Sequence, residues 1–159
     1  NWSFHGDAYP DRDTLLAERN RVIEKHRETT FIGAHVANSA EDLGRVSSWL
    51  DRYPNLMLDI AGRVAELGRQ PYSARRFFLK YQDRILFGTD RYPGRTDQPR
   101  YRVCFRFLET ADEYFDYYEH SFPPTGEWKI YGIHLPDEVL RKVYYQNAAR
   151  IFGLDYSND

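Results

Sequence analysis

Three side chains that can bind a metal or transfer a proton follow short apolar runs of the sequence: His35, Asp59 and Asp90. A carboxylate in such a place can hold a divalent cation or take a proton from water, and a neutral imidazole can coordinate a metal or bond to a reacting carbonyl. The alternatives are structural, because Asp90 could simply cap the following loop and His35 could be a hydrogen-bonded core histidine. We predict catalytic roles for Asp90 and His35, with Asp90 also a metal ligand.

A second group of polar residues follows Asp59. Arg63 and Glu66 lie on the turn after the second apolar run, where they could bind a substrate carboxylate or support a metal ligand. Asp59 could point into the same site or pair with Arg63. A plain salt bridge explains these residues equally well, so both interpretations stay open; the functional one predicts substrate binding by Asp59, Arg63 and Glu66.

The three apolar runs have the composition of buried β-strands, predicted at residues 30–36, 55–61 and 84–89. Each precedes a segment with helical spacing, which indicates an α/β protein with a parallel sheet covered on both faces. The sequence has neither G-x-G-x-x-G nor a Walker motif, which an open nucleotide-binding sheet should show. We therefore expect part of a (β/α)8 TIM barrel, in which the carboxyl ends of the strands share one face.

An eight-stranded barrel takes about 250 residues, more than the 159 present. We therefore expect residues 1–159 to form a single partial domain, the C-terminal portion of the barrel, with the earlier strands upstream. The first residue is Asn1 rather than methionine, which fits a fragment. Open sheet edges would favour self-association, so a homo-oligomer is an expected state.

Apolar residues at helical spacing predict helices around these strands. The first is expected to begin at an Asp13 N-cap, and the second opens near Ser39 and Asp42, which are close to a capping box. The later helices are expected at 71–81, 107–118 and 136–152, with a loop at 91–99 in which Pro93 fixes the exit from the third strand.

Composition and charge exclude several classes of partner. The net charge is -2 and the 22 basic residues never form a run, so we expect neither nucleic acid nor a membrane as partner. No apolar stretch approaches the roughly 18 residues that a membrane helix needs. The single cysteine, Cys104, rules out an internal disulfide, and we expect it to be buried on a helix. A small-molecule substrate is the expected partner, and the cytoplasm is the expected compartment.

Other hydrolytic chemistries lack their motifs. The sequence contains no G-x-S-x-G and no H-E-x-x-H, and Cys104 has no histidine beside it. Two carboxylates at strand ends would suit a glycosidase, but that class gives no reason for His35.

Three motifs carry a family resemblance. They are Arg84-Ile-Leu-Phe-Gly-Thr-Asp90 with Pro93 after it, Phe31-Ile-Gly-Ala-His35, and Asn147-Ala-Ala-Arg-Ile-Phe152. In this order and spacing the sequence resembles the amidohydrolase-related metal-dependent hydrolases (amidohydrolase family 2), a TIM-barrel group that also contains aminocarboxymuconate semialdehyde decarboxylase. The matches span nearly the whole chain.

The resemblance implies a role for each strand-end residue. Asp90 would be the aspartate of the eighth strand, a metal ligand and the general base for the attacking water. His35 would be the histidine of the sixth strand, which orients or polarises the substrate or the water. The implied cofactor is a divalent metal, in this family commonly zinc, and the implied reaction is hydrolysis or decarboxylation of a small carboxylate or ring substrate.

The sequence departs from the family pattern in two places. It contains no H-x-H, the pair that the family carries on its first strand, and Val36-Ala37-Asn38 follow His35 where the family often has Gly-Gly or Gly-Glu. The metal site is therefore expected to be incomplete in this chain, which would be inactive in isolation. An alternative is a non-catalytic binding or interaction module, derived from the barrel, that has lost its metal site.

Overall fold

The computed structural model describes residues 6, 8–92, 98–118 and 122–155, and a parallel three-stranded sheet lies at its centre. Strand β1 (Phe31–Gly33) pairs with β2 (Leu56–Asp59), which pairs with β3 (Ile85–Leu86). The predicted α/β arrangement of three parallel strands with flanking helices is confirmed.

The strands are shorter than predicted, for two local reasons. β1 stops at Gly33 rather than at residue 36, because residues 35–38 all have left-handed backbone dihedrals, with φ between 52° and 60°. β3 stops at Leu86 rather than at residue 89. There the Phe87 amide donates to the Val143 carbonyl (2.9 Å) instead of to a neighbouring strand.

Helices fill the connections and cover the sheet. Their bounds are α1 (Arg12–Lys25), α2 (Ala34–Asn38), α3 (Leu43–Arg52), α4 (Val64–Leu67), α5 (Pro71–Lys80), α6 (Gln98–Glu109), α7 (Asp137–Arg141), the π-helical η1 (Lys142–Gln146) and α8 (Asn147–Phe152). Because residues 35–37 of α2 have left-handed dihedrals, this element is a left-handed turn rather than a regular helix.

The N-caps agree with prediction in one case and differ in another. Asp42 caps α3, and its carboxylate accepts a hydrogen bond from the Arg45 amide at 2.9 Å. The prediction of Asp13 as the cap of α1 is wrong. Asp11 caps this helix, and the bond that its carboxylate accepts from the Thr14 amide (2.7 Å) lowers the Asp11 pKa.

The helix predicted at 107–118 exists with other bounds, because α6 begins at Gln98 and ends at Glu109. Residues 115 and 130 instead form an antiparallel bridge. The last carbonyls of α6 accept amide bonds from the returning segment, since Ile133 donates to Phe107 (2.8 Å) and Leu135 donates to Leu108 (2.9 Å). These long-range bonds end the helix although apolar spacing continues past it.

The final helical stretch is hydrogen-bonded to the residues that lead into β3. It runs from α7 through η1 to α8, close to the predicted 136–152. Asn147 is buried, and its amide group donates to the Gln82 and Ile85 carbonyls, both at 2.8 Å. Arg150 donates to the Asp83 carbonyl at 2.6 Å. Two residues of the C-terminal motif thus hold the chain that enters β3.

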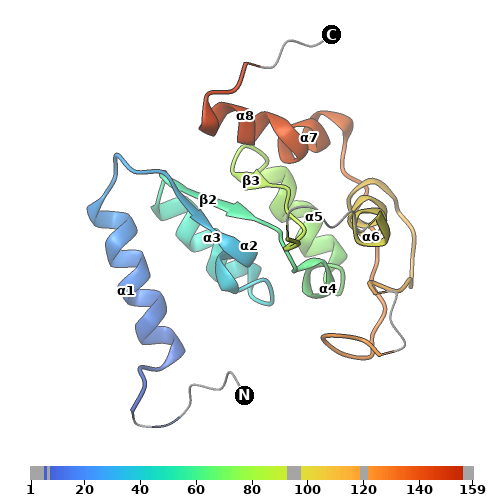
Figure 1. The fold of residues 1–159 in the computed structure, drawn as a ribbon, viewed down its shortest axis with the longest axis horizontal. Helices are drawn as coiled ribbons and strands as arrows, with labels where there is room; N and C mark the ends of the chain where they lie inside the picture. Colours follow the sequence, from blue (N-terminus) through green and yellow to red (C-terminus); the bar gives the residue numbers. More distant parts are fainter. Residues whose placement is uncertain (1–5, 7, 93–97, 119–121, 156–159) are drawn as a thin grey trace.

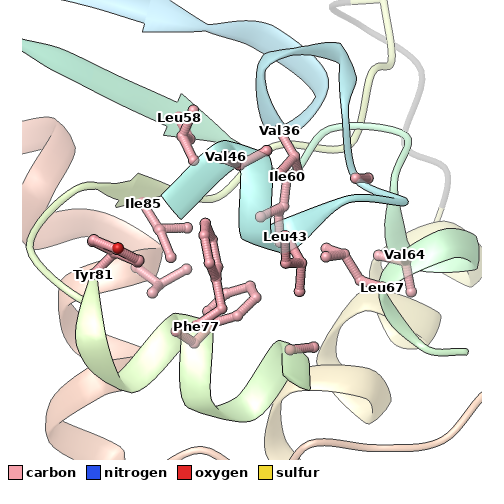
Figure 2. Close-up of a cluster of buried hydrophobic side chains, with 14 of the residues drawn as sticks. Val36, Leu43, Val46, Leu58, Ile60, Val64, Leu67, Phe77, Tyr81 and Ile85 are labelled. Atoms are coloured by element: carbon pink, nitrogen blue, oxygen red, sulfur yellow. The ribbon is translucent and has the colours of Figure 1, made fainter. Parts of the chain in front are cut away.

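One apolar core joins the sheet to its helices. Figure 2 shows side chains from β2, β3, α3, α4 and α5 meeting in a single cluster, with Val36 from the turn after β1 among them. Phe78, Leu58 and Val46 are almost completely buried there. Burial of this kind is the main term that stabilises the fold.

The rest of the fold completes the frame around the strand ends. Figure 1 shows α1 on the β1 side of the sheet, with α4 and α6 on the side toward which the β2 arrow points. Arg84, the first residue of the motif at 84–90, donates to the Tyr53 and Leu56 carbonyls. Cys104 is buried on α6 as predicted, and this burial raises the pKa of its thiol.

Among the described residues, no helix has both the length and the apolar character to cross a membrane. The loop proline Pro93 lies outside the described residues.

Candidate functional site

His35 leaves the sheet in the left-handed turn after β1, and β2 fixes both its backbone and its ring. The His35 amide donates to Asp59 Oδ1 at 2.9 Å, and ring Nδ1 lies 2.7 Å from the Ala61 carbonyl oxygen. A carbonyl can only accept, so Nδ1 carries the proton and donates. In the neutral ring, Nε2 is then left with its lone pair for a substrate, a water molecule or a cation.

The turn that carries His35 depends on a glycine and on two arginines. A Cβ atom on Gly33 would lie 2.9 Å from the Ala37 Cβ, so only glycine lets the turn fold back this closely. From α1, Arg12 donates to the Asn38 carbonyl (2.7 Å) and Arg19 to the Ala37 carbonyl (2.8 Å). The two arginines are seven residues apart, on one face of the helix. They supply the donors that the carbonyls of a left-handed turn lack within the turn itself.

Asp90 leaves β3 on a second left-handed turn, with φ at 59°. Just before it, a Cβ atom on Gly88 would lie 3.1 Å from the Ala61 Cβ, so glycine allows the two backbones to approach closely here. The Asp90 side chain is exposed, and no hydrogen bond or ion pair joins its carboxylate to another described residue. It is therefore free to bind a ligand.

Gly62 marks the place where the two turns meet. Its φ is 66°, and a Cβ atom there would lie 3.4 Å from Asp90 Oδ2 and 3.7 Å from His35 Nδ1. Both functional groups thus approach one point above the Gly62 backbone. The structure brings the ends of β1 and β3 together across the end of β2, as parallel strands require.

Two hollows border Asp90. One, of about 350 Å³, lies between the strand ends, the first turns of α6 and residues 117, 118, 124 and 125. Its lining includes Asp90, Arg100, Val103, Tyr117, Tyr118 and Pro124. The other, of about 470 Å³, is lined by residues 61 and 88–92. The first has the volume typical of small-ligand pockets.

A comparison with known protein families identifies the family to which this chain belongs. A family model described as Amidohydrolase matches residues 3–154, nearly all of the chain. The chain is a member of the amidohydrolase family. No curated protein and no solved structure matches it. The predicted family is confirmed, whereas the relation to the decarboxylase group stays a prediction.

The three predicted substrate-binding residues of this amidohydrolase chain lie apart from the cavity lining. Asp59 Oδ1 accepts two backbone amides, those of His35 and Ala61 (3.0 Å), so this carboxylate shapes the site rather than pairing with Arg63. Arg63 lies 3.4 Å from Glu66 Oε1 and 3.4 Å from Asn38 Oδ1. Glu66 Oε2 is buried and has no hydrogen-bond partner.

The residues at the strand ends do not make up a metal site by themselves. Among the described residues, no group of three or more His, Cys, Asp or Glu side chains could hold a metal ion. His35 and Asp90 offer two donors, and a tetrahedral catalytic site uses three protein ligands. The described part of this amidohydrolase chain therefore does not fit a complete metal centre.

Sequence reasoning missed the far wall of the cavity. Arg100 follows the loop after β3, at the active end of a strand, and that position was a usable signal. Tyr117 and Tyr118 gave no such signal, because their spacing predicted a helix. Tyr117 is buried, and its hydroxyl accepts from the Gly126 amide (2.9 Å) and donates to the Gly126 carbonyl (2.8 Å).

Proposed function

We propose that this chain carries part of the active site of a metal-dependent hydrolase, in which Asp90 moves a proton and His35 orients or polarises the reacting group. The substrate proposed is a small carboxylate or ring compound, and the reaction is hydrolysis or decarboxylation. The approach of Asp90 Oδ2 and His35 Nδ1 to one point over Gly62 is the observation that carries the proposal.

The two residues suit different tasks. The exposed Asp90 carboxylate can accept a proton from water, because no described side chain competes for its oxygens. The His35 ring is held by the bond from Nδ1 to Ala61, so Nε2 presents a lone pair in a fixed direction. Such a ring can accept a hydrogen bond from water or from a substrate hydroxyl, and it keeps this orientation throughout a reaction.

The sheet also supports a proposal about the complete fold. Three parallel strands with helices on their connections, and polar groups at their carboxyl ends, suit the last three strands of an eight-stranded barrel. In that arrangement Asp90 would be one ligand of a divalent metal, for which zinc is the proposed ion, and the remaining ligands would come from outside the described residues. The 159-residue chain alone would then be inactive.

Substitution of Asp90 by Asn tests the proposal in the complete protein. We expect turnover to fall by about 100-fold or more, because loss of a proton-transfer group costs about that factor. The assay follows release of acid or carbon dioxide from a panel of small aromatic carboxylates and amides, and metal content is measured in parallel. Asp83→Asn is the matched control, since Asp83 lies just before β3, at its opposite end.

Unchanged turnover and unchanged metal content in Asp90→Asn would remove Asp90 from the mechanism. If the wild-type protein binds no metal and turns over no member of the panel, the alternative holds: a binding module derived from the barrel.

A further inference from the structure

The cavity beside Asp90 is lined by a half-buried arginine, Arg100, that the proposed proton transfer does not use. Arg100 lines this cavity, and its Nε atom is buried without a hydrogen-bond partner. A guanidinium stays charged at any ordinary pH. Leaving one of its N–H groups buried and unpaired costs free energy, so the site gains stability from any acceptor that reaches it.

The same cavity has walls for an apolar body. Val103, Pro124 and the two tyrosines Tyr117 and Tyr118 line it beside Arg100. The rings of the tyrosines meet edge to face, with centroids 4.9 Å apart. Because the hydroxyl of Tyr117 is fully occupied by Gly126 and Thr125, its ring offers packing surface rather than a polar contact.

The charges of the cavity set the direction in which a ligand can lie. Asp90 borders it as an exposed carboxylate, so an anionic group beside Asp90 would be repelled. Arg91 also lines the cavity as a cation, but it already takes part in an interaction within the protein. The anionic group of a ligand is therefore favoured at Arg100, which leaves the opposite part of the ligand facing Asp90. A carboxylate can accept two parallel hydrogen bonds from the guanidinium edge once that edge turns toward the cavity.

We propose that Arg100 is the specificity residue of this site, and that it binds the carboxylate of a small planar substrate whose body lies against Tyr118 and Pro124. This inference rests on the proposed function and adds which residue recognises the carboxylate. It replaces Arg63, which the sequence suggested for this role but which faces Glu66 and Asn38.

Binding of benzoate to the full chain, measured by calorimetry, tests the assignment. Benzamide is the matched ligand, because it has the same ring without the charge. We expect benzoate to bind more tightly than benzamide, and Arg100→Gln to weaken benzoate about tenfold or more while leaving benzamide unchanged. Arg100→Lys keeps the charge but not the two-pronged geometry, so it should restore only part of the affinity.

Arg102→Gln is the control variant, because it removes the same charge from an exposed position two residues along α6. It should leave benzoate affinity unchanged. Thermal unfolding of each variant checks the fold, and Arg100→Lys carries the test if Arg100→Gln does not fold. Equal affinities for benzoate and benzamide, no detectable benzoate binding, or loss of benzoate in the Arg102 variant would each overturn the proposal.

Asp90→Asn separates this inference from the proposed function. Removing the negative charge should leave benzoate binding unchanged or tighter, while turnover of the complete protein falls. Normal turnover in Asp90→Asn together with Arg100-dependent benzoate binding would defeat the proposed function alone. Lost turnover in Asp90→Asn with benzoate binding that ignores Arg100 would defeat the inference alone.

Discussion

The turns after β1 and β3 carry the two proposed catalytic residues, and they hold them in opposite ways. At His35 the backbone amide, the ring and two carbonyls of the turn all have partners, supplied by Asp59, Ala61, Arg12 and Arg19. At Asp90 the carboxylate has no partner among the described residues. One side chain is fixed by its surroundings and the other is left for a ligand.

The difference shows how one sheet edge can supply both rigidity and reactivity. Asp59 and Asp90 are the same residue type at the ends of adjacent strands, yet the Asp59 carboxylate already accepts hydrogen bonds from the His35 and Ala61 amides. A group that positions its neighbours has few lone pairs left for a substrate. The comparison therefore predicts that stability depends on the first turn and that chemistry depends on the second.

Replacing Asp59 by Ala should have the largest effect on stability. It removes the acceptor for two backbone amides, and each amide left unpaired costs about 1–3 kcal/mol, so we expect a loss of about 3 kcal/mol. Asp90→Asn, which keeps a residue type that tolerates the left-handed backbone at this position, is the matched control and should change the free energy of unfolding by no more than about 0.5 kcal/mol. Urea unfolding measures both. Equal losses in the two variants would break the comparison.

Gly33→Ala should have the next largest effect. The added methyl group would lie 2.9 Å from Ala37 Cβ and 3.2 Å from Leu58 Cδ2, and overpacking of this kind costs about 2 kcal/mol. The turn must also shift, which should alter the His35 ring signals in NMR spectra.

Gly44→Ala on α3 provides the control, because its added methyl group meets only Asp42 Oδ1, at 3.5 Å. It should be neutral or stabilise the helix by up to about 1 kcal/mol. Gly33→Ala with wild-type stability and unchanged His35 signals would show that the turn is not held as tightly as we infer.

The smallest expected effect is a change in stability at high pH, caused by the ionisation of a tyrosine that packs next to β3. Burial, and then the hydrogen bond to Glu109 (2.7 Å), raise the pKa of Tyr144, whose ring packs against Phe87 with centroids 5.3 Å apart. Because the folded pKa is raised, this contribution is complete below the unfolded pKa of about 10 and is lost as the pH rises above it.

Tyr144→Phe should therefore cost about 1 kcal/mol near pH 7 and flatten the fall of stability above pH of about 10. Thermal unfolding between neutral and alkaline pH checks this, with Tyr72→Phe, an exposed tyrosine, as control. An unchanged alkaline slope in Tyr144→Phe would remove Tyr144 from the account.

The sequence was sufficient to predict three parallel strands and the polar residues that follow them. Apolar runs of β-branched and large side chains identify buried strands, and parallel strands must bring their ends together, so the meeting of His35 and Asp90 follows from topology. The family follows from the three motifs at residues 31–35, 84–90 and 147–152, and the match over residues 3–154 confirms it.

The local geometry of the site could not be predicted in the same way. Val36 and Ala37 have no preference for left-handed backbone, and the turn exists because groups from α1 and β2 bind it. The end of α6 has a similar origin, since Ile133 and Leu135 return from far along the chain to bind its carbonyls. Long-range contacts override local spacing in both places.

The turn at residues 35–38 has the handedness of a mirror-image helix, in which D-amino acids would be at ease and L-residues are not. Glycine is the achiral exception, and asparagine, present at position 38, is the best tolerated of the others. In a chemically synthesised chain, a D-alanine at position 37 would match the local backbone better than the natural residue does. Evolutionary exchange at these four positions is therefore limited by chirality as well as by size and polarity.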